Sequence, residues 1–329
     1  MPDLQSPRKP PNRLWLYGPY VALAIVVAAW TVAWVAIRQQ AISAMDQAAG
    51  RLRAQGWTIA WSQRTVEGYP FRLLVRLGQP RIAEPSGWSL AAPALEAEAY
   101  AYAPGNWVIL APQGVTLTRP FGGAAAIGGQ VLKAGFTHLD GQALPQIGIE
   151  GRGLSLQPAP GAQALPITSA GRFAFYLRPL PNDAAEFQLQ LGQATPTATA
   201  LLARLSGERP LDLVWDESVT HVSQLTGRDW PSAVRRWSQA GGGVSLDHGE
   251  VDAGDVKVDA LSGQSAVDAD GHLAGDLLLD FSHAGGATQR LAGGGLGGLA
   301  GALARTDLTF SGGKIRLGPF VIGKAPRVY

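Results

Sequence analysis

From Gly56 to the C-terminus, apolar and polar residues alternate in one short run after another. Alternation with a period of two is typical of β-strands that bury one face, because successive side chains of a strand point to opposite sides. The first run contains Trp57, Ile59 and Trp61. Later candidate strands are residues 94–102, 114–118, 129–138, 146–157, 170–178, 186–191, 211–215, 243–248, 254–261, 264–269, 274–282, 306–311 and 314–322. The body of the chain is therefore predicted to be mainly β.

Helical patterns are few in this body. Residues 198–205 are rich in alanine and leucine. Residues 231–240 follow Asp229, with Pro231 at an early helical position and Gly241 after the last turn, as in a capped helix. Strands and helices do not alternate along the chain, which argues against a parallel α/β fold.

We expect a curved, mostly antiparallel, multi-stranded sheet with a few short helices. The sheet would close as a half-barrel or pack as a sandwich. Residues 56–329 would form one large β-rich domain, or two β subdomains that meet near residues 195–240. Glycine (42 residues) and proline (23 residues) are abundant, as expected for a chain with many turns.

The N-terminal part has a different character. No charged residue occurs from Leu14 to Ile37, and residues 16–37 are long enough to cross a hydrocarbon core, which needs about 20 residues. Aromatic residues lie near both ends, as at membrane interfaces: Trp15, Tyr17, Tyr20, Trp30 and Trp34. A cleaved signal peptide is the alternative, but its apolar region would be shorter, so the length and the tryptophans favour an uncleaved anchor.

Basic residues suggest the orientation of this anchor. Arg8, Lys9 and Arg13 precede the span, which places residues 1–15 in the cytoplasm by the positive-inside rule. Residues 38–55 continue as a helical stalk whose apolar face contains Ile42, Met45, Ala49 and Leu52 at spacings of three and four. That face packs on the protein's own domain or on a partner helix.

A short stretch after the stalk predicts a hairpin: Val66-Glu67-Gly68-Tyr69-Pro70-Phe71-Arg72-Leu73. Glu67 and Gly68 would turn the chain back from the run at Trp57–Trp61, and Pro70, which has no N–H to donate, suits the start of the returning strand. Phe71 would begin the apolar face that continues through Leu73, Val75 and Leu77. Arg72 and Arg76 would lie on the other face, with Arg64 before the turn. They would face solvent, phospholipid headgroups or acidic glycolipid.

The last third is acidic, yet its carboxylates follow the strand pattern. Leu277, Leu279 and Phe281 alternate with Asp276 and Asp280, which gives one apolar and one solvated face. An apolar face of this kind must be buried by a second sheet, a helix or an acyl chain. Candidate residues for contact with lipid or a partner are therefore Tyr69, Phe71, Arg72, Arg76, Leu277, Leu279 and Phe281.

Several functional classes find little support. The chain has no cysteine, and its net charge of +2 with 16% charged residues argues against nucleic-acid binding. Residues 268–271 hint at a calcium loop, but Asp270 and Gly271 fit a two-residue hairpin turn better. Residues 293–298 match a dinucleotide fingerprint without its βαβ context and are expected to form a linker.

Other catalytic patterns are also weak. Ser311 and Lys314 match a Ser-x-x-Lys motif, but the glycines between them predict a hairpin rather than a helix. The five histidines have no metal-ligand spacing, and His248 would point away from Asp247 on a strand. They are His138, His221, His248, His272 and His283. We therefore expect no catalytic residues, no cofactor, no metal and no enzymatic activity.

Four features together resemble a known family: the N-terminal anchor, the Gly68-Tyr69-Pro70-Phe71-Arg72 hairpin, the hairpin at residues 268–276 and the ending at residues 314–329. The chain is similar to the alphaproteobacterial domain of unknown function 2125 family, which is grouped with AsmA-like envelope proteins. The resemblance implies an inner-membrane anchor, an elongated periplasmic β-sheet domain and a Gram-negative host. It also implies a role in lipid transport or outer-membrane homeostasis, and carries no catalytic residues.

Three hypotheses follow for the function. The first is a single-pass inner-membrane protein whose periplasmic sheet contacts phospholipid or another envelope component through an apolar face. The second is a structural or assembly adaptor that recruits an envelope protein through Pro70, Phe71 and exposed strand edges. The third is a periplasmic hydrolase, which would need His248 or His272 to meet a serine or a carboxylate.

Overall fold

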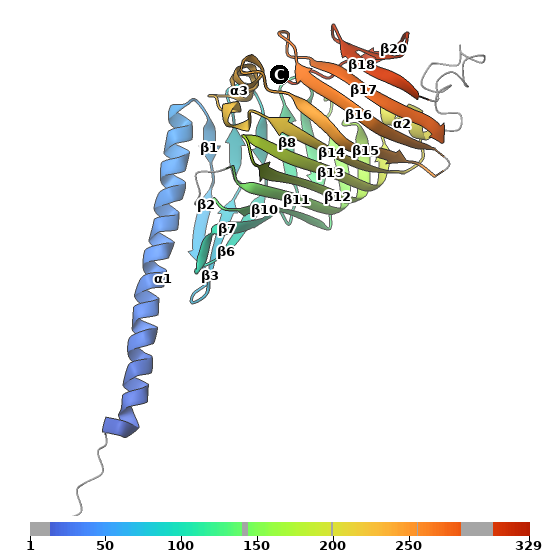
Figure 1. The fold of residues 1–329 in the computed structure, drawn as a ribbon. Helices are drawn as coiled ribbons and strands as arrows, with labels where there is room; N and C mark the ends of the chain where they lie inside the picture. Colours follow the sequence, from blue (N-terminus) through green and yellow to red (C-terminus); the bar gives the residue numbers. More distant parts are fainter. Residues whose placement is uncertain (1–13, 140–143, 199, 255, 284–304) are drawn as a thin grey trace, which may run out of the picture.

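The computed structural model describes residues 14–139, 144–198, 200–254, 256–283 and 305–329. A long N-terminal helix, α1 (Leu14–Ala54), leads into one curved, antiparallel, 20-stranded sheet (Figure 1). The short helices α2 (Leu201–Ser206) and α3 (Trp230–Gln239) and the 3-10 turn η1 (Val222–Gln224) interrupt the strands. The predicted mainly β fold with an N-terminal apolar helix is thus confirmed.

The first ten strands are short. They are β1 (Thr58–Ala60), β2 (Gln63–Glu67), β3 (Arg72–Gly78), β4 (Arg81–Ala83), β5 (Ser89–Ala91), β6 (Ala94–Tyr100), β7 (Ala103–Leu110), β8 (Val115–Arg119), β9 (Gly123–Gly128) and β10 (Val131–Thr137). The later strands are β11 (Gln146–Pro158), β12 (Ile167–Leu180), β13 (Ala184–Pro196), β14 (Leu211–Thr220), β15 (Val244–Asp252), β16 (Lys257–Val267), β17 (Leu273–His283), β18 (Arg305–Ser311), β19 (Lys314–Leu317) and β20 (Phe320–Lys324).

The first ten strands form two arms of the sheet. One arm has the order β1, β4, β5, β8, β9, and the other has the order β2, β3, β6, β7, β10. Both arms end on β11, which pairs with β10 through its first half and with β9 through its second half. The chain therefore crosses from one arm to the other after β1, β3, β5, β7 and β9, and it forms a hairpin within one arm between these crossings.

Prolines stand at three of the five crossings between the arms. Pro80, Pro93 and Pro112 each stand at a crossing, and proline has no N–H with which to continue a ladder. The remaining backbone groups stay paired, since Gln79 N–H donates to the Pro93 carbonyl oxygen at 2.9 Å and Ala92 N–H donates to that of Pro80 at 3.1 Å. The sheet can bend here without leaving backbone donors unsatisfied.

From β11 to β20 every strand pairs with the next one in the chain. Strands β13, β14 and β15 pair in sequence on both sides of residues 195–240, with register irregularities at Leu191–Ala194 and Asp216–Glu217. The alternative of two β subdomains that meet near these residues stays a prediction. The curved second half closes around a core that includes Leu211, Val256 and Leu317, each no more than 1% exposed, with α2 packed against it.

Helix α1 packs on the arm that contains β3. Trp34 and Ala49 are buried, and Ile42 and Met45 pack against a cluster built on Leu73 and Val75. The predicted apolar face of the stalk therefore lies on the protein's own domain. The helix continues through residues 37 and 38 without a break, so the predicted span and stalk are parts of one helix.

Three strand predictions were wrong. Residues 314–322 are not one strand, because β19 ends at Leu317 and β20 begins at Phe320. The first hairpin does not pair the run at Trp57–Trp61 with β3; β2 pairs with β3, and β1 pairs with β4. The β2 strand escaped notice because Val66 is its one buried residue, so it carries little apolar pattern. Residues 254–261 and 264–269 are not two strands, because β16 runs through both with an irregularity near Leu261 instead of a turn.

Both short helices were predicted correctly in type and place. The Asp229 carboxylate accepts the Ser232 N–H at 3.0 Å, Asp229 N–H donates to the Ser232 hydroxyl, and a proline occupies the first turn of α3. This reciprocal capping satisfies donors that a helix start leaves free. Val234 and Trp237 then pack on Val267 and on the C-terminal Tyr329.

Candidate functional site

The tip of the β2–β3 hairpin is attached to α1. Gly68 has a φ of +106°, which favours glycine, and its carbonyl oxygen accepts the Arg72 N–H at 2.9 Å. Trp30 Nε1 donates to the Pro70 carbonyl oxygen at 2.9 Å, and Trp34 Nε1 donates to that of Arg72 at 3.0 Å. The stretch that stood out in the sequence is thus the point where the sheet binds the apolar helix.

One aromatic residue of the tip differs from its prediction. Phe71 does not begin the apolar face: it is 62% exposed, because the chain is still in the turn at that point and β3 begins only at Arg72. Tyr69 lies edge-on to Trp34, with ring centroids 5.4 Å apart, and its hydroxyl is 2.7 Å from Thr31 Oγ1.

The two predicted arginines form ion pairs along the polar face. Arg72 lies 2.7 Å from a Glu98 oxygen. Arg76 contacts Glu67 at 2.9 Å and Glu96 at 3.2 Å. Their charges are already balanced by neighbouring carboxylates, although both arginines remain half exposed.

The other predicted residues lie in the second half of the sheet. Leu277, Leu279 and Phe281 all lie on β17 and line an apolar cavity of about 110 Å³ under α2. They are far in sequence from the tip of the β2–β3 hairpin. Ligand pockets are usually about 300–1,000 Å³, so this cavity is small for a lipid chain. Protein side chains occupy most of the apolar face here.

A larger apolar site lies where the arm that contains β4, β5 and β8 meets α3, and we name it the tryptophan groove. It is open to solvent and has a volume of about 530 Å³. Its lining residues are Trp57, Ile82, Glu84, Trp88, Ser89, Leu90, Leu117, Trp230 and Val328. Ile82, Leu90 and Leu117 are direct cross-strand partners on β4, β5 and β8, so they form one row on one face of the sheet.

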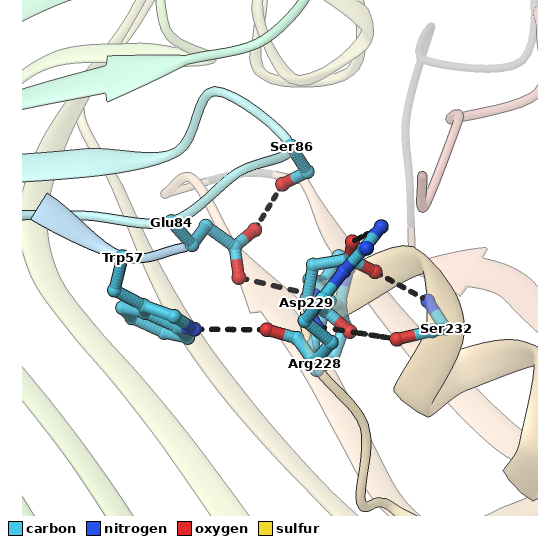
Figure 2. Close-up of polar contacts among 7 residues, drawn as sticks. Trp57, Glu84, Ser86, Arg228, Asp229 and Ser232 are labelled. Carbon is cyan, nitrogen blue, oxygen red and sulfur yellow. Dashed lines mark hydrogen bonds and ion pairs between the residues drawn. The ribbon is translucent and has the colours of Figure 1, made fainter. Parts of the chain in front are cut away.

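Hydrogen bonds between distant segments hold this groove (Figure 2). Trp57 Nε1 donates to the Arg228 carbonyl oxygen at 2.8 Å, and Trp230 N–H donates to Glu84 Oε2 at 3.0 Å. Ser86 donates its hydroxyl to the other Glu84 oxygen. The carboxylate of Glu84 therefore joins the β4–β5 turn to the start of α3.

Electrostatics at the start of α3 favour the same geometry. Hydrogen bonding from Ser232, followed by the nearby Arg228 guanidinium, lowers the pKa of the Asp229 carboxyl below its ordinary value. Asp229 is thus ionised at neutral pH and caps the helix that presents Trp230. Trp230 Nε1 also donates to the Val328 carbonyl oxygen at 2.8 Å, which ties the C-terminal segment to the groove.

The groove was missed in the sequence because its parts are far apart. Trp57 and Arg228 are separated by 171 residues, and Glu84 and Trp230 by 146 residues. The available signal was local: Trp88 and Trp230 both stand in or beside turns, after Gly87 and before Pro231. Tryptophans at such positions suggest a surface role, but not that they meet.

The weak catalytic motifs have structural explanations. Asp268 Oδ1 accepts N–H groups of Asp270 and His272 in the β16–β17 connection, which is longer than the predicted two-residue turn. His272 Nδ1 lies 3.8 Å from Asp268, beyond hydrogen-bond distance. Ser311 pairs with Lys314 across a hairpin, as predicted. The glycine motif at residues 293–298 lies outside the described residues.

Metal ligands do not cluster in the part of the chain that the structure describes, where no three His, Asp or Glu side chains are placed to hold an ion. The structure brings Tyr69, Phe71 and Arg72 together beside α1, places Arg76 farther along β3, and keeps the Leu277 group apart. The same sheet therefore carries an apolar groove and packs against the apolar helix α1.

These features define a β-sheet protein with an N-terminal helix long and apolar enough to cross a membrane and an open apolar groove. The chain belongs to the family DUF2125, described as "Uncharacterized protein conserved in bacteria", whose model matches residues 34–326. No curated protein and no solved structure matches the chain. The relationship to AsmA-like envelope proteins therefore stays a prediction.

Proposed function

We propose that this protein is a single-pass inner-membrane protein whose sheet lies in the periplasm and binds a lipid acyl chain in the tryptophan groove. Its role would be lipid transport or envelope homeostasis. The observation that carries the proposal is the groove itself: about 530 Å³, open, and lined almost entirely by apolar side chains. This volume falls in the range of small-molecule sites.

The N-terminal part of α1 supports the proposal of a membrane anchor. Every residue from Tyr17 to Ala29 is exposed, and the stretch carries no charge. Figure 1 shows this part of the helix projecting beyond the sheet. Such a surface is unfavourable in water by about 25 cal/mol for each Å² of apolar area, whereas lipid would cover it. The basic residues Arg8, Lys9 and Arg13 favour a cytoplasmic N-terminus.

The chemistry of the groove favours an uncharged chain as ligand. Among the described lining residues there is no basic side chain, and the Glu84 carboxylate already accepts two hydrogen bonds. A phosphate headgroup would find no counter-charge there. Indole rings and the row formed by Ile82, Leu90 and Leu117 can instead pack along methylene groups, each worth about 0.8 kcal/mol when buried.

The apolar surface continues from the groove toward α1. A second hollow of about 170 Å³ shares Ile82 and Leu90 with the groove and extends to Leu77 and Leu95. Leu77 also packs against the cluster that holds α1 on the sheet. This continuity supports a ligand that comes from the membrane.

A filling substitution tests the proposal. Full-length protein in detergent is titrated with a phosphatidylethanolamine that carries a fluorescent acyl chain. Leu90→Trp fills the groove and should weaken binding about tenfold, whereas Leu180→Trp is the control, since Leu90 and Leu180 are 37% and 39% exposed. Absence of lipid binding by the unmodified protein, or equal binding by both variants, would overturn the proposal.

The adaptor hypothesis keeps one supporting observation. Strand β20 pairs with β19 alone among the described strands, so backbone groups on its other edge could meet a partner strand, although the Ile322 carbonyl oxygen already accepts from Arg204 at 3.1 Å. We propose it as the second candidate function. Photocrosslinking from Val321, 55% exposed on β20, should then capture one envelope protein in membranes; if it captures none, the adaptor role fails.

A further inference from the structure

We propose that one edge of the sheet is seated in the periplasmic interface of the membrane that α1 crosses. This edge, named here the aromatic tip, consists of Tyr69 and Phe71 on the β2–β3 turn, Tyr100 at the end of β6 and Tyr102 on the β6–β7 turn. The inference rests on the proposed anchoring of α1, and adds a second membrane contact made by the sheet.

The depth of the aromatic tip follows from the helix. A hydrocarbon core needs about 20 helical residues, and the last charge before the span is Arg13, so a core that begins at Leu14 reaches Ala33. Trp30 and Trp34 hold the hairpin tip by hydrogen bonds to backbone carbonyls. The tip therefore lies level with the last turns of the apolar span, not above it.

The alternative depth is unfavourable. If the membrane ended below the tip, the span would consist of residues 14–29, which rise only about 24 Å, against a core of about 30 Å. Figure 1 shows the β2–β3 hairpin beside the middle of α1. Attachment at this height leaves too little free helix to cross the hydrocarbon alone.

The composition of the tip fits an interface. Tyr69, Phe71, Tyr100 and Tyr102 are 48%, 62%, 47% and 68% exposed. The two turns are neighbours, since Ala101 N–H donates to the Phe71 carbonyl oxygen at 2.9 Å, and Tyr100 stacks on Tyr102 with centroids 5.1 Å apart. Aromatic side chains with polar ends are enriched at headgroup depth.

Nearby charges are compatible with this depth. Arg72 pairs with Glu98 and lies over the Tyr100 ring at 5.8 Å. Arg38 Nε donates to the Val66 carbonyl oxygen at 3.0 Å. Long arginine side chains of this kind can keep their heads at the polar level while their stems lie in the apolar one.

The absence of cysteine makes a depth measurement direct, because each introduced cysteine is the sole thiol of the chain. Phe71→Cys and Tyr102→Cys are each labelled with a nitroxide in full-length protein reconstituted into vesicles of phosphatidylethanolamine and phosphatidylglycerol. Phe121→Cys is the matched control, since Phe121 is 66% exposed on the turn between β8 and β9 of the other arm. Val26→Cys reports on the span.

We expect Phe71→Cys and Tyr102→Cys to collide several-fold less with a water-soluble nickel chelate than Phe121→Cys does. If the Val26→Cys label is in the hydrocarbon while both tip labels are as accessible as that of Phe121→Cys, the seating of the tip is wrong and the anchor stands. If the Val26→Cys label is itself aqueous, the anchor fails, and this inference fails with it.

Discussion

The indole N–H of Trp30 donates to the carbonyl oxygen of Pro70 at 2.9 Å, across 40 residues of chain. Proline cannot donate a backbone hydrogen bond, but its carbonyl remains an acceptor, and Pro70 lies in the turn before β3 begins at Arg72. The helix therefore supplies the donor that the turn lacks. Trp34 repeats the arrangement one turn later at Arg72.

Trp34→Ala should lower the free energy of unfolding by about 3 kcal/mol or more, since a buried tryptophan is lost with its hydrogen bond to the Arg72 carbonyl oxygen. Denaturant titration in detergent measures the change. Val35→Ala, on the exposed side of the same helix, should change it by less than about 0.5 kcal/mol. Equal losses in both variants would show that α1 does not pack on the sheet as described.

Two glycine substitutions should have opposite effects. In Gly68→Ala, the new Cβ would stand 2.7 Å from the Arg72 carbonyl oxygen at a φ of +106°, so we expect a loss of about 1–3 kcal/mol. Gly50→Ala lies within α1 with nothing within 4 Å and should gain about 0.5–1 kcal/mol. Thermal melting measures both, and a neutral Gly68→Ala would contradict the turn.

Asp229→Ala should lower stability by about 1 kcal/mol at neutral pH, because the cap of α3 is lost. Asp229→Asn, which can also cap, is the control and should lose less. The pKa of Asp229 is held below its ordinary 3.8, so its contribution is present above that pH and disappears as the pH falls through the lowered value. Thermal melts between pH 7 and acid conditions should show that the stability difference between Asp229→Ala and the unmodified protein becomes smaller as the pH falls.

Glu217 gives the opposite pH dependence. Burial raises its pKa, although the Trp215 indole N–H donates to it at 2.6 Å. Its ionisation therefore opposes folding: the folded state is favoured at low pH, and this advantage is lost as the pH rises above 4.5 through the raised value. Glu217→Gln should be more stable than the unmodified protein at neutral pH, with the difference vanishing near pH 4. An unchanged difference across pH would refute it.

Period-two patterns predicted the mainly β body because each strand buries one face, a property that is local to a few residues. The same reasoning missed β2, whose burial depends on α1, and it misplaced Phe71, since alternation cannot tell a turn residue from the first residue of a strand. Capping residues around Asp229 were enough to predict α3, because a cap is satisfied within four residues.

The candidate site was predicted less completely. Tyr69 and Arg72 were singled out, and they do lie together beside the apolar helix, but their meeting with Trp34 and Glu98 requires the folded sheet. The tryptophan groove was not predicted at all. Its lining comes from the arm that contains β4, β5 and β8, from α3 and from the C-terminal segment. A sequence pattern within one of these segments does not show that the segment contacts the others.

Local sequence patterns were enough to predict the mainly β class, the apolar N-terminal helix, both short helices and the family, because each depends on residues close together in the chain. The folded sheet was needed to show that Trp30 reaches Pro70, that the first ten strands form two arms, and that Trp57, Glu84 and Trp230 enclose one groove. Those relationships depend on hydrogen bonds and packing between segments separated by 40 to 171 residues, whose geometry is set only when the whole sheet has formed.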